Sequence, residues 1–447
     1  MEFEVTEVAQ ALGLNSDNHA RVTGWSVDSR NIAPGDLFFA LRGPNHDGNA
    51  YVDEVLRKGT VAAVASEMRP GPVLVVPDTL VALQSAAAWA LNQWGGEVIG
   101  VTGSAGKTST KDVIAAMLAA RMSVGKTVGN LNNHVGVPLS ILRLPSQVRV
   151  AVLEMGMNHA GEIRELCAIA RPHIGVVTNV GYAHMWAFDS IEGVAAAKRE
   201  LIESLPPDGI AVLNADDPLV SRFREVHRGR SITFGINCEA DIRARHVQLT
   251  DRGVIFTVGD VPFESALVGR HSVLNILAGL AVASIYGIRP AELIGVARDL
   301  AAPPMRGERL DHDGVVILND CYNSSPDAAR AMIDVLRDTP AKRRIAVLGE
   351  MLELGRWSES LHRDVGRYAA ANVIDVILGI SGDAGQLVEA AKEAGMAADA
   401  ALFFADAPAA GDYLRRIARS GDVILFKGSR GTHVEHALES FVARNPN

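Results

Sequence analysis

The sequence of 447 residues predicts an α/β protein with three domains: a small N-terminal α/β domain, a central domain around a mainly parallel sheet, and a C-terminal Rossmann-like α/β domain. At roughly 150 residues per domain, the length allows about three domains. From residue 97 onward, apolar strand segments alternate with helical patterns, as in βαβ units. The linker Ala301-Ala302-Pro303-Pro304 interrupts this alternation. We therefore expect domains at 1–96, 97–308 and 309–447.

The N-terminal segment mixes short strands with helices and turns. Strands are expected at 38–41 and 73–76, and a helix is expected at 80–94, where Gly95-Gly96 ends it. The stretch 28–36 is dense in turn residues.

The central segment carries a regular alternation of strands and helices. Residues 231–268 have shorter alternating stretches, which predict an antiparallel insertion, and the apolar stretch 273–288 predicts a buried helix, since it falls short of the ~20 residues of a membrane span. The expected strands are 98–101, 148–153, 174–178 and 210–214, and the expected helices are 111–121, 161–170 and 191–204.

The C-terminal segment repeats the alternation and predicts a second doubly wound sheet. The expected strands are 315–318, 345–348, 373–378 and 423–426, and the expected helices are 325–337, 361–371, 384–394 and 408–420.

Composition narrows the class of protein. The net charge of −9 argues against nonspecific nucleic-acid binding, which needs a basic surface. Three widely spaced cysteines imply neither a disulfide framework nor a zinc site. The acidic start of the chain lacks the basic and apolar regions of a signal peptide. We expect a cytoplasmic protein without a membrane span.

The run 101–109 predicts a phosphate-binding loop of the P-loop ATPase type, because an apolar strand precedes it and an amphipathic helix follows. Glycines let the backbone approach phosphate oxygens, and the N–H groups at the helix start point toward them. Lys107 supplies positive charge and Thr108 a hydroxyl for Mg²⁺. The spacing is two residues shorter than the common G-x-x-x-x-G-K-[ST]. The loop residues are Gly103, Ser104, Ala105, Gly106, Lys107, Thr108 and Ser109.

Polar residues follow the next two expected strands, at the sheet edge where parallel sheets bind ligands. Glu154 follows strand 148–153 and can bind Mg²⁺, or it can cap the next helix as a surface carboxylate. Asn179 and His184 follow strand 174–178; His184 is equally compatible with a structural role.

Two further features admit more than one interpretation. The asparagines in the expected loop 130–138, including Asn133, can bind phosphates or carboxylates, or can form Asx turns. Lys198 lies in an expected helix, where an exposed lysine is the default.

In the third domain, two motifs follow strands. Asp320, Tyr322 and Asn323 stand between a strand and a helix, and the turn 427–431 combines basic and small residues. Lys427, Ser429 and Arg430 can form an anion pocket there, or a surface turn.

In this order, the motifs resemble the Mur ligases, ATP-dependent enzymes that build the peptide stem of peptidoglycan, and the resemblance covers nearly the whole chain. Stretches 28–30, 34–41 and 46–48 are similar to the family's UDP-substrate domain, and 102–108 to its ATP loop. Gly269-Arg270-His271 with Asn275 is similar to the adenine-side motif, and Arg306 to an interdomain arginine.

Within the family, the stretches 106–111, 130–138, 320–323 and 349–355 resemble the branch that joins D-alanyl-D-alanine to UDP-N-acetylmuramoyl-tripeptide. The Asp-Asn-Pro-Arg motif expected of the member that adds the third residue does not occur. His134, Cys321 and Ser324-Ser325 depart from the branch's commoner residues.

The resemblance implies a reaction through an acyl phosphate, two Mg²⁺ ions and a monomer. It assigns Lys107, Glu154, His184 and Lys198 to catalysis, with Lys198 carbamylated, and the first metal to Thr108 and Glu154. His184 and Lys198 would hold the second metal. Asn275, Arg306 and Asp320 would contact ATP. The implied substrate contacts are Asp28, Ser29, Arg30, Asn45, His46, Asp47, Asn133, Tyr322, Asn323, Lys427, Ser429 and Arg430.

Two other functions fit the same residues. One is a Mur-type ligase that adds a single amino acid, and the other is a nucleotide-binding protein that does not catalyse. A hinge near Pro303-Pro304 is expected if three domains close around one site.

Overall fold

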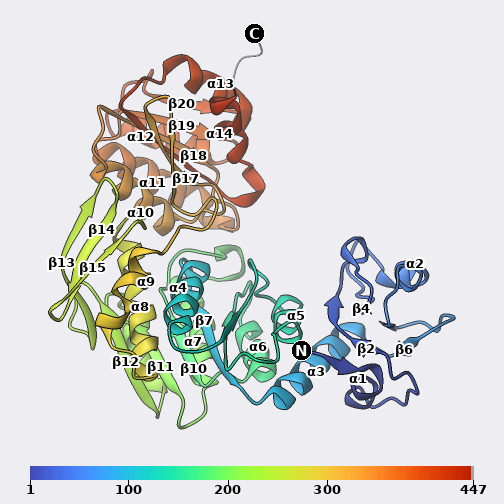
Figure 1. Cartoon of the computed structure of the whole chain (residues 1–447). Coiled ribbons are helices and arrows are strands. Elements are labelled where there is room, and N and C mark those ends of the chain that lie inside the picture. The colour runs from blue at the N-terminus through green and yellow to red at the C-terminus, as the bar shows by residue number, and fades with distance from the viewer. Residues whose placement is uncertain (444–447) are drawn as a thin grey trace.

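The computed structural model describes residues 1–443. Figure 1 shows three parts along the chain: an N-terminal part in blue, a central part in cyan to yellow, and a C-terminal part in orange and red. The central part lies between the other two. Each part contains its own sheet, so the predicted α/β class is confirmed.

The N-terminal part is built on a parallel four-stranded sheet in the order β3-β4-β5-β6, with a small antiparallel β1-β2 pair beside it. The predicted helix 80–94 is present as α3, which Asp78 caps by accepting the N–H groups of Leu80 and Val81 at 2.8 and 3.0 Å. The elements are β1 Phe3–Glu4, α1 Val5–Ala11, β2 Arg21–Val22, β3 Gly24–Ser26, β4 Asp36–Phe39, α2 Val52–Arg57, β5 Ala62–Ala65, β6 Val73–Val75 and α3 Thr79–Trp94.

The central part has a nine-stranded sheet in the order β15-β14-β13-β12-β11-β10-β7-β9-β8. Strands β7 to β12 with β8 run parallel, and helices cover both faces, which explains the continuous apolar strand segments. The elements are β7 Glu97–Thr102, α4 Lys107–Ala119, β8 Val124–Lys126, α5 Gly136–Leu142, β9 Val150–Glu154, α6 Glu162–Ala170, β10 Ile174–Val177, α7 Ile191–Glu203, β11 Ile210–Asn214, β12 Arg230–Gly235, β13 Ile242–Thr250, β14 Gly253–Val258, β15 Val261–Ser265, α8 Arg270–Ile285 and α9 Ile294–Arg298.

Several boundaries in the central part differ from the sequence expectation. Helix α4 begins at Lys107 rather than at 111, because left-handed Gly106 (φ 79°) starts it directly after the loop. The expected loop 130–138 ends in helix α5, which begins at Gly136. The antiparallel insertion is confined to β13–β15, whereas β12 is parallel to β11 and continues the sheet. Helix α8 is buried, as predicted from its apolar stretch.

The C-terminal part has a six-stranded sheet in the order β16-β17-β21-β18-β19-β20, parallel except for edge strand β16. The short edge strands β16 and β20 and helix α14 were not predicted. The elements are β16 Glu308–His312, β17 Val315–Asp320, α10 Pro326–Asp338, β18 Arg343–Gly349, α11 Ser358–Ala371, β19 Val376–Ile380, α12 Ala384–Glu393, β20 Ala401–Phe404, α13 Ala407–Ile417, β21 Asp422–Lys427 and α14 Glu435–Val442.

Within residues 1–443, every helix is too short or too polar to cross a bilayer.

Candidate active site

The phosphate loop lies between β7 and α4 and is braced by the segment that follows β10. Asn179 accepts the Ala105 N–H through Oδ1 at 2.8 Å, and Thr178 donates its hydroxyl to the Ala105 carbonyl at 2.7 Å. Gly103 has φ 152°, and a Cβ there would lie 1.9 Å from the Thr178 hydroxyl oxygen, so only glycine fits. Asn179 therefore fixes the shape of the loop.

Lys107, the first residue of α4, is partly buried and its ammonium lies against the loop. Its Nζ donates to the Gly103 carbonyl at 2.9 Å. Burial lowers the pKa of Lys107, while the negative charges of Glu154 and Glu353 oppose that effect. A bound phosphate would add a negative charge next to this ammonium group.

Glu154 ends β9 and lies beside the start of α4. Its Oε2 accepts the Thr108 hydroxyl at 2.8 Å and its Oε1 accepts the Asn132 amide at 2.7 Å, while the Lys111 Nζ is 4.0 Å from Oε2. Glu154 is 1% exposed, so it is not the surface carboxylate of the alternative interpretation. A hydroxyl and a carboxylate side by side are hard oxygen donors, and they fit Mg²⁺.

Asn132 and Lys111 are contacts that the sequence did not single out. Lys111 is buried and donates to the carbonyls of Thr127 and Gly129 at 2.8 and 3.0 Å. Asn133, whose site role the resemblance implied, is exposed and forms a turn before α5, in which its Oδ1 accepts the Gly136 N–H at 2.8 Å. A cluster of asparagines gives no periodicity from which to choose the one that reaches Glu154.

Lys198 in α7 is 1% exposed, so the default of an exposed helix lysine is wrong. Burial lowers the pKa of Lys198 well below its usual value, and the nearby positive charge of Lys107 lowers it further. Such an environment favours the neutral amine, the form that reacts with carbon dioxide to give a carbamate. The residue therefore fits the carbamate role that the family resemblance implies.

His184 precedes a short 3₁₀ turn (Met185–Ala187) and has a left-handed backbone with φ 58°. Its Nδ1 lies 2.7 Å from Oε2 of Glu353, a residue of the C-terminal part. The local sequence could not predict this contact, because the two residues lie in loops of different parts of the chain.

Asn275 and Arg306, the residues that the resemblance assigns to ATP, have different surroundings. The Oδ1 of Asn275 accepts the Thr110 hydroxyl at 3.0 Å and would be 3.0 Å from a Cβ at Gly106, so Asn275 backs the start of α4. Arg306 stacks on the Tyr322 ring at 3.6 Å from its centroid. The positive charge of Arg306 acts to lower the pKa of Lys107, so the two cations lie within electrostatic range of each other.

Asp320 and Lys427 end neighbouring strands β17 and β21. The Lys427 Nζ donates to Asp320 Oδ2 at 2.5 Å and to the Asn323 carbonyl at 3.0 Å. Burial lowers the pKa of His271, with Asp320 and Lys427 as its charged neighbours. The structure thus joins residues that the sequence assigned separately to ATP and to substrate.

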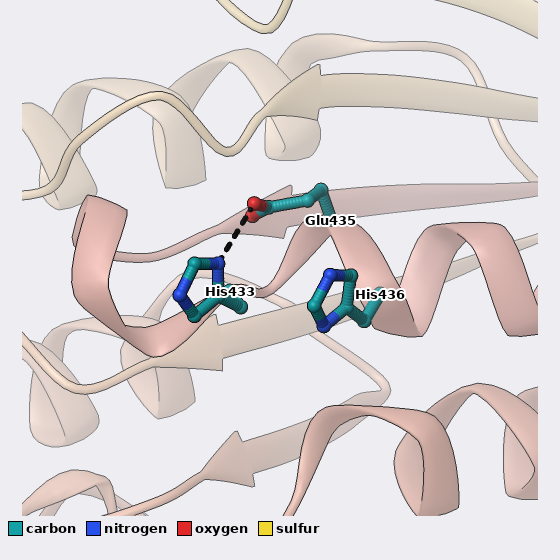
Figure 2. A group of neighbouring side chains, drawn as sticks. All are labelled: His433, Glu435 and His436. Atoms are coloured by element: carbon teal, nitrogen blue, oxygen red, sulfur yellow. Dashed lines mark hydrogen bonds and ion pairs between the residues drawn. The ribbon is translucent and has the colours of Figure 1, made fainter.

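The glycine turn after β21 is held by neighbouring loops. The buried Ser429 hydroxyl accepts the Leu352 N–H at 2.8 Å, and Arg430 pairs with Glu435 at 3.0 Å. Figure 2 shows Glu435 with His433 and His436, whose ligand atoms lie within 4.8 Å of one another. The two rings stack in parallel (8°, centroids 5.2 Å apart), so their in-plane lone pairs do not converge as metal ligation requires. We interpret Glu435 as the common ion-pair partner of Arg430 and His433, with His436 stacked on His433.

The candidate uridine-side residues lie on the surface of the N-terminal part. Asp28 accepts the Arg30 backbone N–H at 3.0 Å and pairs with its guanidinium at 2.8 Å, which lowers the pKa of Asp28 to about 2. Lys58 donates to the Ser29 carbonyl at 3.0 Å. Asp47 pairs with Arg42 at 2.8 Å. Asn45 and His46 are exposed.

Comparison with known proteins defines the class. The Mur ligase middle domain model matches residues 101–283, and the model for the Mur ligase glutamate ligase domain matches residues 305–430. The chain belongs to the Mur ligase family.

Two relatives that match over nearly their full length have the same name. UDP-N-acetylmuramoyl-tripeptide–D-alanyl-D-alanine ligase of Bacillus subtilis is 34% identical over 430 residues, covering 94% of this chain and 93% of the relative. The same ligase of Escherichia coli is 34% identical over 93% of this chain and 92% of its own length.

Two solved structures extend the likeness to the fold. MurF from Acinetobacter baumannii has a TM-score of 0.90 at 27% identity, and 99% of each chain is covered. MurF ligase from Thermotoga maritima in complex with ADP has a TM-score of 0.83 at 32% identity, covering 94% of this chain and 97% of that one.

Proposed function

We propose that this chain is an ATP-dependent ligase that joins D-alanyl-D-alanine to UDP-N-acetylmuramoyl-tripeptide, giving ADP, phosphate and the pentapeptide of peptidoglycan synthesis. Full-length likeness to ligases of that activity supports the substrates. The observation that carries the chemistry is the arrangement at the start of α4, where the Lys107 ammonium lies against the phosphate loop and the buried Thr108 hydroxyl is bonded to the buried Glu154 carboxylate.

The reaction has two steps. A carboxylate oxygen of the tripeptide attacks the γ-phosphorus of ATP, and ADP leaves with the bridging oxygen. The D-alanyl-D-alanine amine then attacks the acyl carbon of the acyl phosphate; the C–O bond breaks, phosphate leaves, and the amine loses a proton.

The residues of this chain supply charge and position for both steps. Lys107 neutralises the transferring phosphoryl group, and the loop N–H groups orient it. Thr108 and Glu154 would hold one Mg²⁺, and His184 with carbamylated Lys198 would hold a second. Bound metal ions offset the repulsion between the anionic carboxylate and ATP. Arg306, Asn275 and Asp320 are assigned to ATP.

Each of the three parts binds a different substrate. Residues 1–96 bind the uridine nucleotide through two surface loops, one with Asp28, Ser29 and Arg30 and one with Asn45, His46 and Asp47. Residues 97–308 bind ATP, and residues 309–447 present the dipeptide to the acyl phosphate through Lys427, Ser429 and Arg430. A hinge at Pro303-Pro304 lets them close, so small-angle scattering should show compaction with tripeptide and an ATP analogue. Unchanged profiles would contradict the hinge. We place this enzyme in the cytoplasm as a monomer.

Phosphate release tests the substrates. With ATP and UDP-N-acetylmuramoyl-tripeptide, D-alanyl-D-alanine should support turnover, whereas single amino acids should not. Turnover with a single amino acid instead would identify a different Mur-type ligase. Absence of turnover with any acceptor would favour a nucleotide-binding protein without catalysis.

Lys198 has its own test. Lys198→Ala should lower kcat by about 10²-fold, since a fixed charge group at the reacting centre is lost. Acetate or formate should restore part of the rate by replacing the carbamate oxygens. Arg199→Ala on the same helix, where Arg199 pairs with Glu203 at 2.8 Å, is the matched control and should keep full activity. Full activity of Lys198→Ala would exclude the carbamate role.

A further inference from the structure

A loop of the C-terminal part docks on the segment that carries His184. The Oε2 of Glu353 lies 2.7 Å from Nδ1 of His184, and the Glu353 carbonyl accepts the Trp186 N–H at 3.0 Å. Nearby, Arg356 pairs with Asp189 at 2.9 Å. Glu353 is therefore held to the central part by its backbone as well as by its side chain.

Both residues of this contact have an uncommon backbone conformation. His184 has φ 58° and Glu353 has φ 65°, the left-handed region that non-glycine residues rarely occupy. Gly355, with φ 53°, lies so close to Trp186 that a Cβ would be 2.9 Å from its Cα. Such strain persists only where the surroundings enforce it, and it concentrates at functional sites.

The same carboxylate reaches the phosphate loop electrostatically. The negative charge of Glu353 acts to raise the pKa of Lys107 against the effect of burial. Glu353 therefore contacts His184 and lies within electrostatic range of Lys107.

We propose that Glu353 is a positioning residue that makes His184 competent only while the C-terminal part is docked. The carboxylate pairs with Nδ1 at 2.7 Å and so holds the ring in place, and Nε2 is the nitrogen that would be available to bind a metal ion. Carboxylates behind metal-binding histidines act in this way. The proposal rests on the role of His184 given under the proposed function. It links formation of the acyl phosphate to presence of the part that brings the amine.

The test compares two contacts of the same interface. Glu353→Ala should lower kcat by about 10–100-fold with little change in the KM for the UDP substrate, as for loss of an orienting partner. Arg356→Ala removes the neighbouring ion pair and leaves Glu353 at His184. Its kcat should stay within about twofold of wild type, because exposed ion pairs contribute little. Glu353→Gln keeps the volume and replaces Glu353→Ala if that variant does not fold.

A double-mutant cycle shows whether Glu353 acts through His184. In a His184→Ala background, Glu353→Ala should cause no further loss, because the partner is already gone. Multiplied losses in the double variant would overturn the proposal, as would equal activities of Glu353→Ala and Arg356→Ala.

Calorimetry with a nonhydrolysable ATP analogue and UDP-N-acetylmuramoyl-tripeptide gives a readout independent of turnover. Glu353→Ala should weaken binding of the analogue about tenfold or more in Mg²⁺ and leave its binding in EDTA unchanged. Equal weakening in both conditions, or none in Mg²⁺, would overturn the proposal. An inactive wild type would instead refute the proposed function, while the calorimetric comparison would still decide the role of Glu353.

Discussion

The phosphate loop and the uridine-side loops of the N-terminal part hold their polar side chains in different ways. At the phosphate loop, partners are distant in sequence and buried, as in the Thr108–Glu154 bond between two elements of the central part. At the N-terminal loops, partners are a few residues apart and exposed, as in the pair of Arg30 (side chain 85% exposed) with Asp28.

The difference separates a preorganised site from an adaptable one. Buried donors and acceptors fixed by several elements need little reorganisation when charge develops, which is how an active site stabilises a transition state. Exposed local pairs contribute little to stability, so a ligand can exchange with them at low cost. Substitutions should therefore affect turnover in the first region and substrate affinity in the second.

The largest effect is expected at the phosphate loop. Lys107→Ala should lower kcat by about 10³-fold, because a preorganised positive charge is lost from the transferring phosphoryl group. Phosphate release measures this. Lys126→Ala, which removes an exposed lysine paired with Asp112 at 2.6 Å, is the control and should retain activity. If Lys107→Ala kept full turnover, the phosphate loop would not be the region that controls turnover, and the comparison with the N-terminal loops would fail.

A stability effect is expected at the Asp320–Lys427 pair. Asp320→Ala leaves the buried Lys427 ammonium without its carboxylate and should lower the free energy of unfolding by about 3 kcal/mol. Urea denaturation monitored by fluorescence measures it. A double variant with Lys427→Met should recover much of the loss, since it removes the unpaired charge. An unchanged midpoint for Asp320→Ala would show that solvent reaches the pair.

The smallest effect is expected at the exposed loops. Arg30→Ala should raise the KM for the UDP substrate about tenfold, as for loss of one charge-assisted bond, and should leave kcat and the unfolding midpoint unchanged. Arg21→Ala, which removes an exposed pair with Glu2 at 2.9 Å in the same part, is the control. If Arg30→Ala lowered kcat and left KM unchanged, Arg30 would act on turnover, as the residues of the phosphate loop are expected to do.

Much of the architecture could be predicted because its signals are local. The strand before Gly103 and the helix after Lys107 follow from apolar periodicity and glycine spacing, and so does the parallel sheet around them. Predicted helix boundaries were less accurate. Helix α4 begins at Lys107, four residues before the predicted start, because left-handed Gly106 rather than a polar cap precedes it. Edge strands such as β20 (Ala401–Phe404) were missed because four residues carry little periodicity.

The sequence by itself determined the chemistry that this protein can carry: a phosphate loop with Lys107 and Thr108, a carboxylate after the next strand, and the order of motifs that marks the family. Only the tertiary structure decided which side chains meet. In the folded chain Lys198 is buried, and Asn132 rather than Asn133 is the partner of Glu154. Glu353, in a loop of the C-terminal part, contacts His184 of the central part. Burial and long-range contacts depend on packing between elements far apart in the chain, and no local pattern of residues encodes them.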